Sequence, residues 1–298
     1  MIQFVADGII NASLIALGAL GLSMTYNILR FANFAHGEII ATGAYFSLVV
    51  VVLIGAGAGA LGPLAFGWPV LFGLVVSLLC TSIVVLVVDW LVFRQLRGKQ
   101  ASRIALIMAA FGLSLMGRNI ITLIAGGDPV YFSFYIQRAV EVVPGVKATP
   151  DEIVVVCVTA VCLLALYLFL TRTTLGKSMR ATAENPTLAQ INGIDTRAVI
   201  RWTWIIGACL ASVAGTFQGQ TIQLRPEMGF DFLLPMFAAL ILGGVGNLYG
   251  TVIGALIIGI GEAFAVAFGA SDYRLSISFL IMIVILLVRP HGLLGERA

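Results

Sequence analysis

An apolar run and a polar run stand side by side in this chain: IVVVCVTAVCLLALYLFL (residues 153–170) is followed by TRTTLGKSMRATAENPTLAQINGIDTRAVIR (residues 171–201). A helix rises 1.5 Å per residue, so the first run spans most of the roughly 30 Å of hydrocarbon in a bilayer. Lipid offers the backbone no hydrogen-bond partners, so such a run must be helical. The second run is basic and is the longest strongly polar stretch. Together they predict a membrane protein with a structured polar segment on one side.

The composition extends this interpretation to the whole chain. Of the 298 residues, 60% are hydrophobic and 10% are charged, whereas soluble domains carry roughly 25% charged residues. The mean hydropathy is +1.06. The apolar runs lack the apolar-out, polar-in alternation of β-barrel strands. We therefore expect an all-α polytopic membrane protein that forms a single transmembrane domain over residues 1–298.

Charge and cysteine usage exclude other classes of protein. A net charge of +3, spread over several short connections, is too small to indicate nucleic-acid binding. The four cysteines lie inside apolar runs without the spacing of a metal site, so we expect neither a metal nor a redox role. We expect no cofactor. The first ten residues contain Asp7 and no basic residue, which favours a retained span over a cleaved signal peptide.

The apolar runs predict about nine spans, or eight if one segment is re-entrant. Residues 232–288 hold enough apolar residues for three spans or for two and a broken one. The six earlier runs cover about 5–29, 39–54, 68–93, 104–125, 153–170 and 202–224.

The distribution of Lys and Arg predicts the orientation, because short cytoplasmic loops are enriched in these residues. The basic connections all fall on one side if the spans alternate, which places the N-terminus outside and the C-terminus in the cytoplasm. The connections at 55–67 and 126–152 then lie outside. The segments expected in the cytoplasm are Arg30, 94–103, 171–201 and 289–297.

Sequence motifs for catalysis are missing. A P-loop requires G-x-x-x-x-G-K-[ST], and Gly176-Lys177-Ser178 supplies only its tail, with Thr171 at the position of the first glycine. His36-Gly37-Glu38 resembles the H-x-E of zinc deaminases, but no cysteine pair follows it at a suitable spacing. No Ser/His/Asp set indicates a hydrolase.

Small residues repeat at helical spacing on several spans. Gly207, Ala211 and Gly215 share one helix face, and so do Gly250 and Gly254. Because helices in lipid associate through close backbone approach, these stripes predict packing surfaces.

A few polar residues within predicted spans stand out, because such groups are costly there. Arg118 and Asn119 lie inside the fourth run, and Glu262 lies near the middle of a late one. Each either lines a solute path or makes a structural pair between helices, with Arg118 and Glu262 as one possible pair. Asp89, close to a basic connection, is expected to reach the membrane surface by snorkelling.

The segment NFAHGE at the start of the second run predicts a non-helical or capped beginning of that span. Asn33 and Glu38 would satisfy the freed backbone groups there. Asn247 is followed by Gly250 and Gly254, as Asn33 is followed by a Gly/Ala-rich span. Interrupted helices in corresponding positions of two repeats often flank a transport path, so Asn33, Glu38 and Asn247 are further candidates for lining one.

The polar segment 171–201 contains helix punctuation. Asn185 precedes Pro186, the order of an N-cap and a first helical residue. This predicts a short helix over 187–192 that Gly193 ends, with an earlier turn over 178–183. The alternative is a solvated loop with a basic inner edge.

Three segments together resemble the permeases of bacterial branched-chain amino acid ATP-binding-cassette (ABC) importers. They are NFAHGEIIATGAY (33–45), the pattern G-x-S-M-R-A-x-A-E-N-P-x-x-A-x-x-x-G-I (176–194) and FAALILGGVGNLYGTVIGALIIG (237–259). The resemblance covers nearly the whole chain, and the short length is similar to the smaller of that family's two permease types. Members of the family also serve urea and short amides, and more distant relatives carry sugars.

The resemblance implies a set of partners: a second, similar permease, two cytoplasmic ATPases, an extracytoplasmic binding protein and the lipid bilayer. The polar segment would be the coupling segment seated in a cleft of an ATPase, and the binding protein would select the solute. The residues implied in coupling are Arg180, Ala183, Glu184, Asn185, Pro186, Ala189 and Gly193.

Two other classes of function remain as alternatives. An ion-coupled secondary transporter or a channel would act alone, but charged residues at the membrane midplane are few for an ion relay. An intramembrane enzyme would need a catalytic pair inside the bilayer, which the sequence does not offer. The transported solute, and whether the permease pairs with itself or with a relative, stay open.

Overall fold

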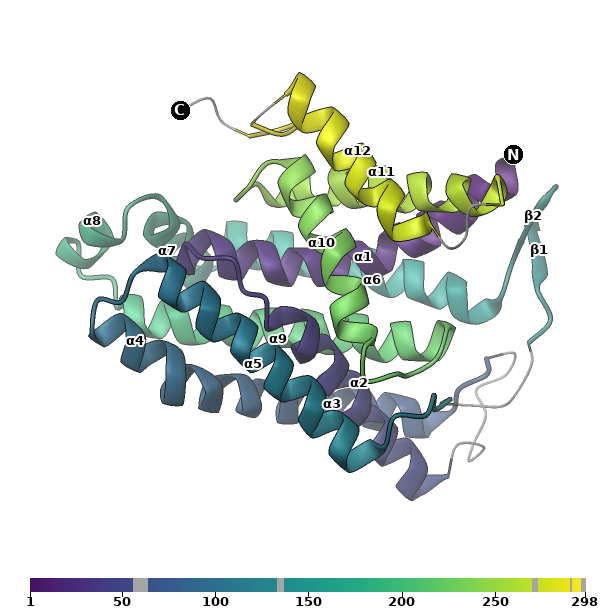
Figure 1. Cartoon of the computed structure of the whole chain (residues 1–298), viewed down its shortest axis with the longest axis horizontal. Helices are drawn as coiled ribbons and strands as arrows, with labels where there is room; N and C mark the ends of the chain where they lie inside the picture. Colours follow the sequence, from purple (N-terminus) through teal and green to yellow (C-terminus); the bar gives the residue numbers. More distant parts are fainter. Residues whose placement is uncertain (56–63, 133–136, 270–272, 290, 296–298) are drawn as a thin grey trace.

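The computed structural model describes residues 1–55, 64–132, 137–269, 273–289 and 291–295, and within these ranges it is mostly helical (Figure 1). The elements in chain order are α1 (Ile2–Leu29), α2 (His36–Ile54), α3 (Trp68–Val88), the π-helical turn η1 (Asp89–Phe93), α4 (Arg94–Gly98), α5 (Arg103–Ala125), β1 (Val140–Val143), β2 (Val146–Ala148), α6 (Pro150–Arg172), α7 (Thr174–Glu184), α8 (Pro186–Ile191), α9 (Thr196–Thr221), α10 (Met228–Gly243), α11 (Leu248–Ala267) and α12 (Arg274–Val288).

Nine apolar helices of the described chain correspond to the predicted spans. Seven are long and apolar enough to cross a membrane. Two shorter ones, α10 and α12, have 16 and 15 residues. The all-α polytopic fold class is therefore confirmed, and the region after residue 232 holds α11 and two short helices. The connection expected at 55–67 lies largely outside the described residues, as does Arg297.

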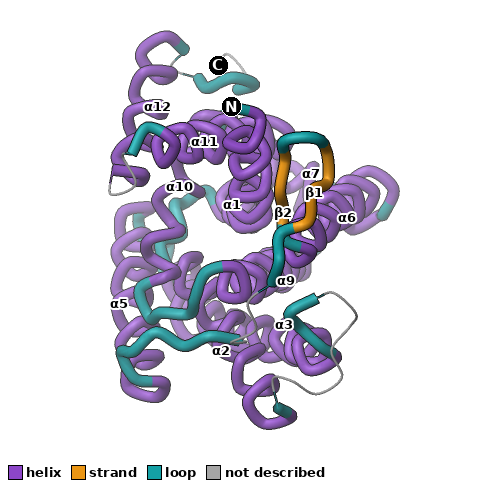
Figure 2. Tube along the Cα trace, turned by 90° about the vertical axis from the view of Figure 1, so that its right-hand side faces the viewer, coloured by secondary structure: helices purple, strands orange, loops and turns teal. Residues whose placement is uncertain are grey.

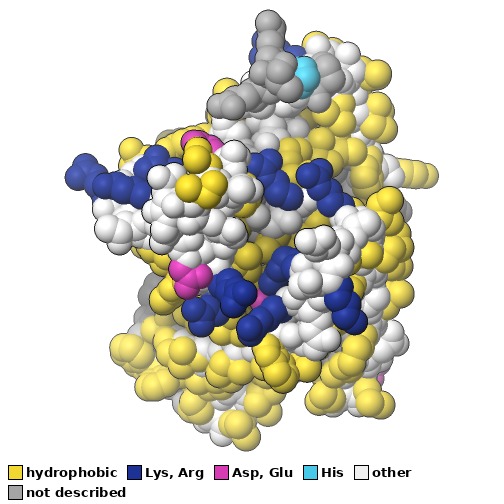
Figure 3. Space-filling view, turned by 90° about the vertical axis from the view of Figure 1, so that its left-hand side faces the viewer, with side chains coloured by type: hydrophobic (Ala, Val, Ile, Leu, Met, Phe, Trp, Pro, Cys, Tyr) yellow, Lys and Arg dark blue, Asp and Glu magenta, His cyan; other side chains and the backbone are white. Residues whose placement is uncertain are grey.

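The two ends of the helix bundle differ in charge. One end carries α4, α7 and α8, and the opposite end carries the N-terminus and the β1–β2 hairpin (Figure 1). Lys and Arg side chains gather on the first of these, which we call the basic end (Figure 3). The basic connections predicted from the sequence thus do share one side of the molecule.

The hairpin is an element that the sequence analysis missed. Strands β1 and β2 pair antiparallel with Val140 opposite Ala148 (Figure 2). Gly145 in the turn has a φ of 85°, and a Pro-Gly pair between valines was an available turn signal. Gln3 of α1 fixes the hairpin, because its amide nitrogen donates to the Lys147 carbonyl at 2.8 Å.

Helix α2 begins deep inside the bundle instead of at its basic end. His36 Nε2 donates to the carbonyl of Gly18, in the middle of α1, at 3.1 Å. Gly18 precedes the last residue of α1, Leu29, by about 16 Å of helix. The chain therefore runs back along α1 before α2 starts, and this confirms the predicted non-helical beginning. Asn33 Oδ1 accepts the Ala35 amide at 3.2 Å, as the prediction required.

Helix α10 begins where α2 begins. It crosses the bundle steeply to α1 (Figure 1), and a Cβ on Gly229 would overlap the carbonyl oxygen of Gly37. The reverse also holds, because a Cβ on Gly37 would overlap the Gly229 carbonyl. Only glycine allows two backbones to approach this closely.

The predicted small-residue stripes are packing surfaces. A Cβ on Gly215 of α9 would overlap the carbonyl oxygen of Ile40 in α2. Gly250 of α11 meets the backbone of Gly243, and Gly254 meets that of Ala239 in α10. These contacts surround α1, whose central residues are almost all buried.

The possible pairing of Arg118 with Glu262 is wrong. The carboxylate of Glu262 instead accepts from Asn11 at 2.8 Å, Arg274 at 2.6 Å and Ser278 at 2.6 Å. These partners come from α1 and α12, so the buried Glu262 joins three helices. Four residues of separation place Arg274 and Ser278 on one face of α12, where both reach the same carboxylate.

The expected snorkelling of Asp89 is also wrong. This side chain is 6% exposed and accepts from Trp204 Nε1 at 2.8 Å and from Arg97 at 2.7 Å. Trp204 also stacks on Phe93 with ring centroids 5.4 Å apart. A buried carboxylate is tolerated here because two donors replace its water.

We expect Gly215→Ala to destabilise the protein by about 2 kcal/mol or more, the cost of forcing extra atoms into a packed contact. The matched control is Gly112→Ala in α5, where a Cβ would have nothing within 4 Å. The control should be neutral or stabilising by up to about 1 kcal/mol, because alanine favours helix. Thermal unfolding of the purified protein in detergent measures both. Equal effects of the two substitutions would contradict the close contact.

Candidate functional site

A charged cluster lies where α2, α5 and α10 meet. Glu38, in the first turn of α2, is 4% exposed. Its Oε1 accepts from Ser114 of α5 at 3.4 Å and lies 3.8 Å from Nε of Arg118. The Glu38 side chain therefore points to α5 and does not satisfy the backbone at the start of α2, as the sequence analysis expected.

The cluster continues onto α10. The Arg118 guanidinium lies over the ring of Phe230, 4.6 Å from its centroid, a favourable cation–π arrangement. Asp231 follows in the first turn of α10 and interacts electrostatically with Arg118, Arg225 and Glu227. The sequence analysis missed Arg225, Glu227 and Asp231, because the polar segment 225–231 is short and follows a span closely. We call Glu38, Ser114, Arg118 and Asp231 the interhelical cluster.

Several polar atoms of this region lack partners. Within the described residues, Glu38 Oε2, Asn33 Nδ2 and two nitrogens of Arg118 are buried without a hydrogen bond. Buried polar groups usually have partners, because an unmade hydrogen bond costs about 1–3 kcal/mol. Unsatisfied groups at this depth are therefore suited to meeting a polar solute or polar groups of a neighbouring subunit.

The interhelical cluster contains some of the predicted path residues and not others. Glu38 and Arg118 belong to it, and Asn33 lines the same cavity as Glu38. Asn119 is exposed on α5, and its amide donates to the carbonyl of Leu115 in the same helix at 2.7 Å.

Asn247 and Glu262 lie elsewhere. Asn247 caps α11 at its first turn, accepting the Gly250 amide at 3.0 Å. The neighbouring Gly246 carbonyl accepts from Asn27, near the end of α1, at 2.9 Å. Asn247 thus lies far along α1 from the start of α2, and the helix that meets α2 there is α10. The expected correspondence between Asn33 and Asn247 is not found.

The polar segment at the basic end forms two helices, as predicted, although the first is longer than expected. Asn185 caps α8 by accepting the Leu188 amide at 3.0 Å, and Pro186 is its first residue. Gly193 follows the end of α8 with a φ of 82°, a conformation that glycine adopts without strain. Asp195 then caps α9 by accepting two backbone amides.

The exposed surface of α8 is partly apolar. Leu188 and Ile191 are 55% and 77% exposed, although they lie on a short helix at the basic end. Ala189 is buried, so its side chain packs inward and cannot contribute to a contact surface, contrary to the sequence analysis. The sequence analysis missed the two exposed apolar residues, Leu188 and Ile191.

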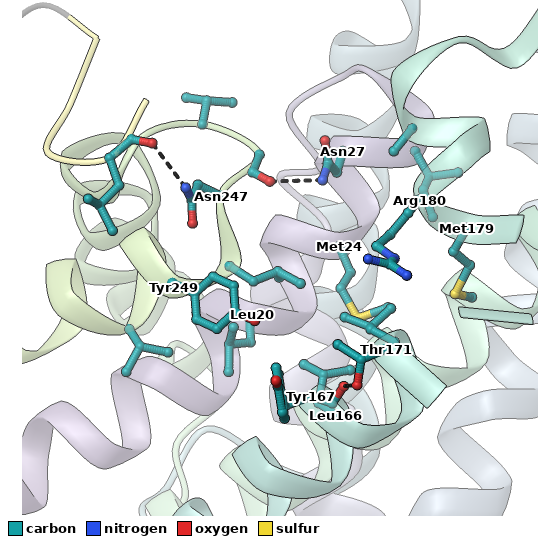
Figure 4. Close-up of a pocket in the computed structure, with 18 of the residues that line it drawn as sticks. Leu20, Met24, Asn27, Leu166, Tyr167, Thr171, Met179, Arg180, Asn247 and Tyr249 are labelled. Carbon is teal, nitrogen blue, oxygen red and sulfur yellow. Dashed lines mark hydrogen bonds between the residues drawn. The ribbon is translucent and has the colours of Figure 1, made fainter. Parts of the chain in front are cut away.

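The segment is attached to the centre of the bundle through α1. Arg30, just past the end of α1, donates to the carbonyl of Ala183 in α7. Met179 of α7 is buried in the main core. Between α1, α6, α7 and α11 there remains a cavity of about 750 Å³ (Figure 4).

The sequence of this chain matches the family model described as branched-chain amino acid transport system / permease component over residues 4–286. The chain belongs to this family. Membership and the long apolar helices make this permease a multi-pass inner-membrane protein.

Relatives resemble the permease over almost its entire length. The high-affinity branched-chain amino acid transport system permease protein LivH of Escherichia coli K12 is 33% identical over 99% of this chain and 96% of its own. The permease protein BraD of Pseudomonas aeruginosa is 30% identical over the same shares. The solved structure of PsaBC from Streptococcus pneumoniae in complex with Fab has a TM-score of 0.54 and 11% identity, covering 97% of this chain and 93% of that one. At this identity the likeness supports the fold alone.

A double-mutant cycle distinguishes the observed pairing from the one expected at first. Glu38→Ala and Arg118→Ala should each destabilise the permease, and together by about 1 kcal/mol less than the sum, because contacting residues couple. Arg118→Ala with Glu262→Ala should be additive, since the two residues share no partner. Thermal unfolding of the purified variants measures both cycles. Coupling only in the second cycle would contradict the observed geometry.

Proposed function

We propose that this permease is the transmembrane subunit of an ABC importer that moves branched-chain amino acids, or related small amino acids and amides, across the cytoplasmic membrane. Family membership over residues 4–286 carries the proposal. Relatives named as branched-chain amino acid permeases support the class of solute. The subunit would form one permease domain and would be non-catalytic, with ATP hydrolysed by separate subunits.

The charge distribution supports the orientation. The basic end would face the cytoplasm by the positive-inside rule, which puts the N-terminus and the hairpin outside. Two ATPases would dock on the cytoplasmic face, a second homologous permease would pair within the membrane, and a solute-binding protein would deliver solute from outside.

Helices α7 and α8 would be the coupling segment. Glu184, Asn185 and Pro186 are exposed, and Leu188 and Ile191 add an apolar surface beside them. Exposed aliphatic side chains with polar groups around them are suited to a protein interface. Gly193 would set the shape of the segment, and Ala183 would connect it to Arg30 and α1.

The interhelical cluster would contribute to the translocation path. Its unsatisfied groups carry both signs of charge, as does an amino acid with its ammonium and carboxylate groups. Helices α2 and α10 both begin beside it inside the bundle, and transporters commonly place substrate sites where helices break. Asn33, Glu38 and Arg118 remain the proposed lining at the cluster, with Asp231 added, and Asn119 would face the path from the exposed surface of α5. Asn247 and Glu262 are better explained as structural groups.

Reconstitution in proteoliposomes tests the proposed function. Uptake of leucine should require the permease, its partner permease, both ATPases, ATP and the binding protein. Urea and short amides serve as the competing solutes. Uptake by this subunit alone, without an ATPase, would support instead a stand-alone secondary transporter or channel.

Variants of the coupling segment test its role. Glu184→Ala, Gly193→Val and Ile191→Ser should reduce ATPase co-purification and solute uptake by roughly tenfold or more, the effect expected when residues at the centre of an interface are lost. Solute binding by the binding protein should stay intact. Gln95→Ala, on exposed α4 at the same end, is the matched control. Normal recruitment and uptake in all three variants would exclude the coupling role.

A further inference from the structure

The cavity at the basic end is large and is enclosed by four helices. Its volume of about 750 Å³ lies within the range of about 300–1,000 Å³ that buries a drug-sized molecule. A free amino acid or phosphate ion would fill only a small part of it. Helix α1 forms its floor, and α6, α7 and α11 contribute its walls. The occupant that fits it is therefore larger than the proposed solutes.

The inner part of the cavity is apolar and its rim is aromatic. Apolar side chains from three helices line it: Leu163 and Leu166 of α6, Val252 of α11 and Leu20 of α1. At the rim Tyr167 and Tyr249 form an edge-to-face pair with ring centroids 6.2 Å apart. Both tyrosines are exposed, at 46% and 61%, on helices that are apolar enough to span the membrane. Tyrosines favour the boundary between hydrocarbon and water, so this pair indicates that the rim lies near that boundary.

Arg180 provides a cation for this cavity. It lines the cavity from α7, and its guanidinium points between Met24 and Thr171 (Figure 4). Within the described residues it makes no hydrogen bond or ion pair, whereas Arg30 at the same mouth donates to Ala183. Arg180 was also expected among the ATPase contacts; it is exposed at the mouth of the cavity.

We propose that the cavity binds an anionic phospholipid of the cytoplasmic leaflet. The headgroup phosphate would accept hydrogen bonds from Arg180, with Arg30 beside it, and an acyl chain would lie along the leucines. Guanidinium matches phosphate geometry well, and basic pockets between helices at this face suit anionic headgroups. Glu184 also lines the mouth, so one carboxylate stands against two guanidinium groups and the balance still favours an anion.

The site has a consequence for coupling, which rests on the proposed function. A lipid in the cavity touches α7 and α1 together, so it would hold the coupling segment against the centre of the bundle. Anionic lipid would then increase ATP-driven uptake. Lipid binding itself requires no import activity, so the two statements are tested separately.

Native mass spectrometry of the purified transporter complex tests the site. Titration with phosphatidylglycerol should give a tightly retained lipid, and phosphatidylcholine should not replace it. Arg180→Gln should weaken phosphatidylglycerol retention by about tenfold, the loss expected when one charge-assisted hydrogen-bonding group is removed. Leu163→Trp, which fills the apolar part and keeps the charge, should also weaken retention. The matched control is Arg172→Gln, a basic residue at the end of α6 that does not line the cavity.

The other outcomes distinguish the lipid site from its alternatives and from the proposed function. Retention that falls equally in the Arg172 and Arg180 variants indicates general attraction of anionic lipid to the basic end. Displacement of the lipid by millimolar inorganic phosphate, or protection by leucine alone, assigns the cavity to a small solute. If Arg180-dependent retention is found but no ATP-driven uptake occurs in any lipid, the lipid site stands and the proposed function fails. If uptake occurs and retention ignores both Arg180 and Leu163, the lipid site fails and the function stands.

Discussion

The backbones of α2 and α10 touch at Gly37 and Gly229, and much of the remaining arrangement depends on this contact. Lipid provides no hydrophobic force between helices, so their association relies on close packing of small residues. A side chain at either glycine would separate the two helices. Because α2 must start beside α10, the chain after Arg30 has to return into the bundle before α2 can begin.

The start of α2 inside the bundle determines which polar groups lie there. Each of the two helices that begin there carries an acidic residue in its first turn, Glu38 in α2 and Asp231 in α10. A negative charge is stabilised at a helix N-terminus by the exposed amide groups there. Arg118 lies near both carboxylates, and Arg225 adds a second positive charge close to Asp231. The polar groups of the proposed path are thus a result of where two helices begin, and the packing glycines set that place.

Helix α1 connects the start of α2 to the basic end. Helix α1 runs from the hairpin end to Arg30, where it contacts α7, and its midpoint holds His36 at the start of α2. A displacement of the α7–α8 segment therefore has a continuous route of packed contacts to the starts of α2 and α10. The cavity beside α1 lies along this route at the basic end, between α1 and α7, so its occupant would affect how firmly the segment is held.

The sequence by itself determined the helical spans, the basic end and the caps of the polar segment, because these follow from local hydrophobicity, charge and the backbone preferences of residues such as Asn185, Pro186 and Gly193. It did not determine which helices touch. Arg118 was considered as one possible partner of Glu262, and Asn33 was aligned with Asn247, whereas the fold pairs Arg118 with Glu38 and places α10 beside α2. Partners on different helices depend on the depth and rotation at which each helix packs, and the tertiary structure alone sets both.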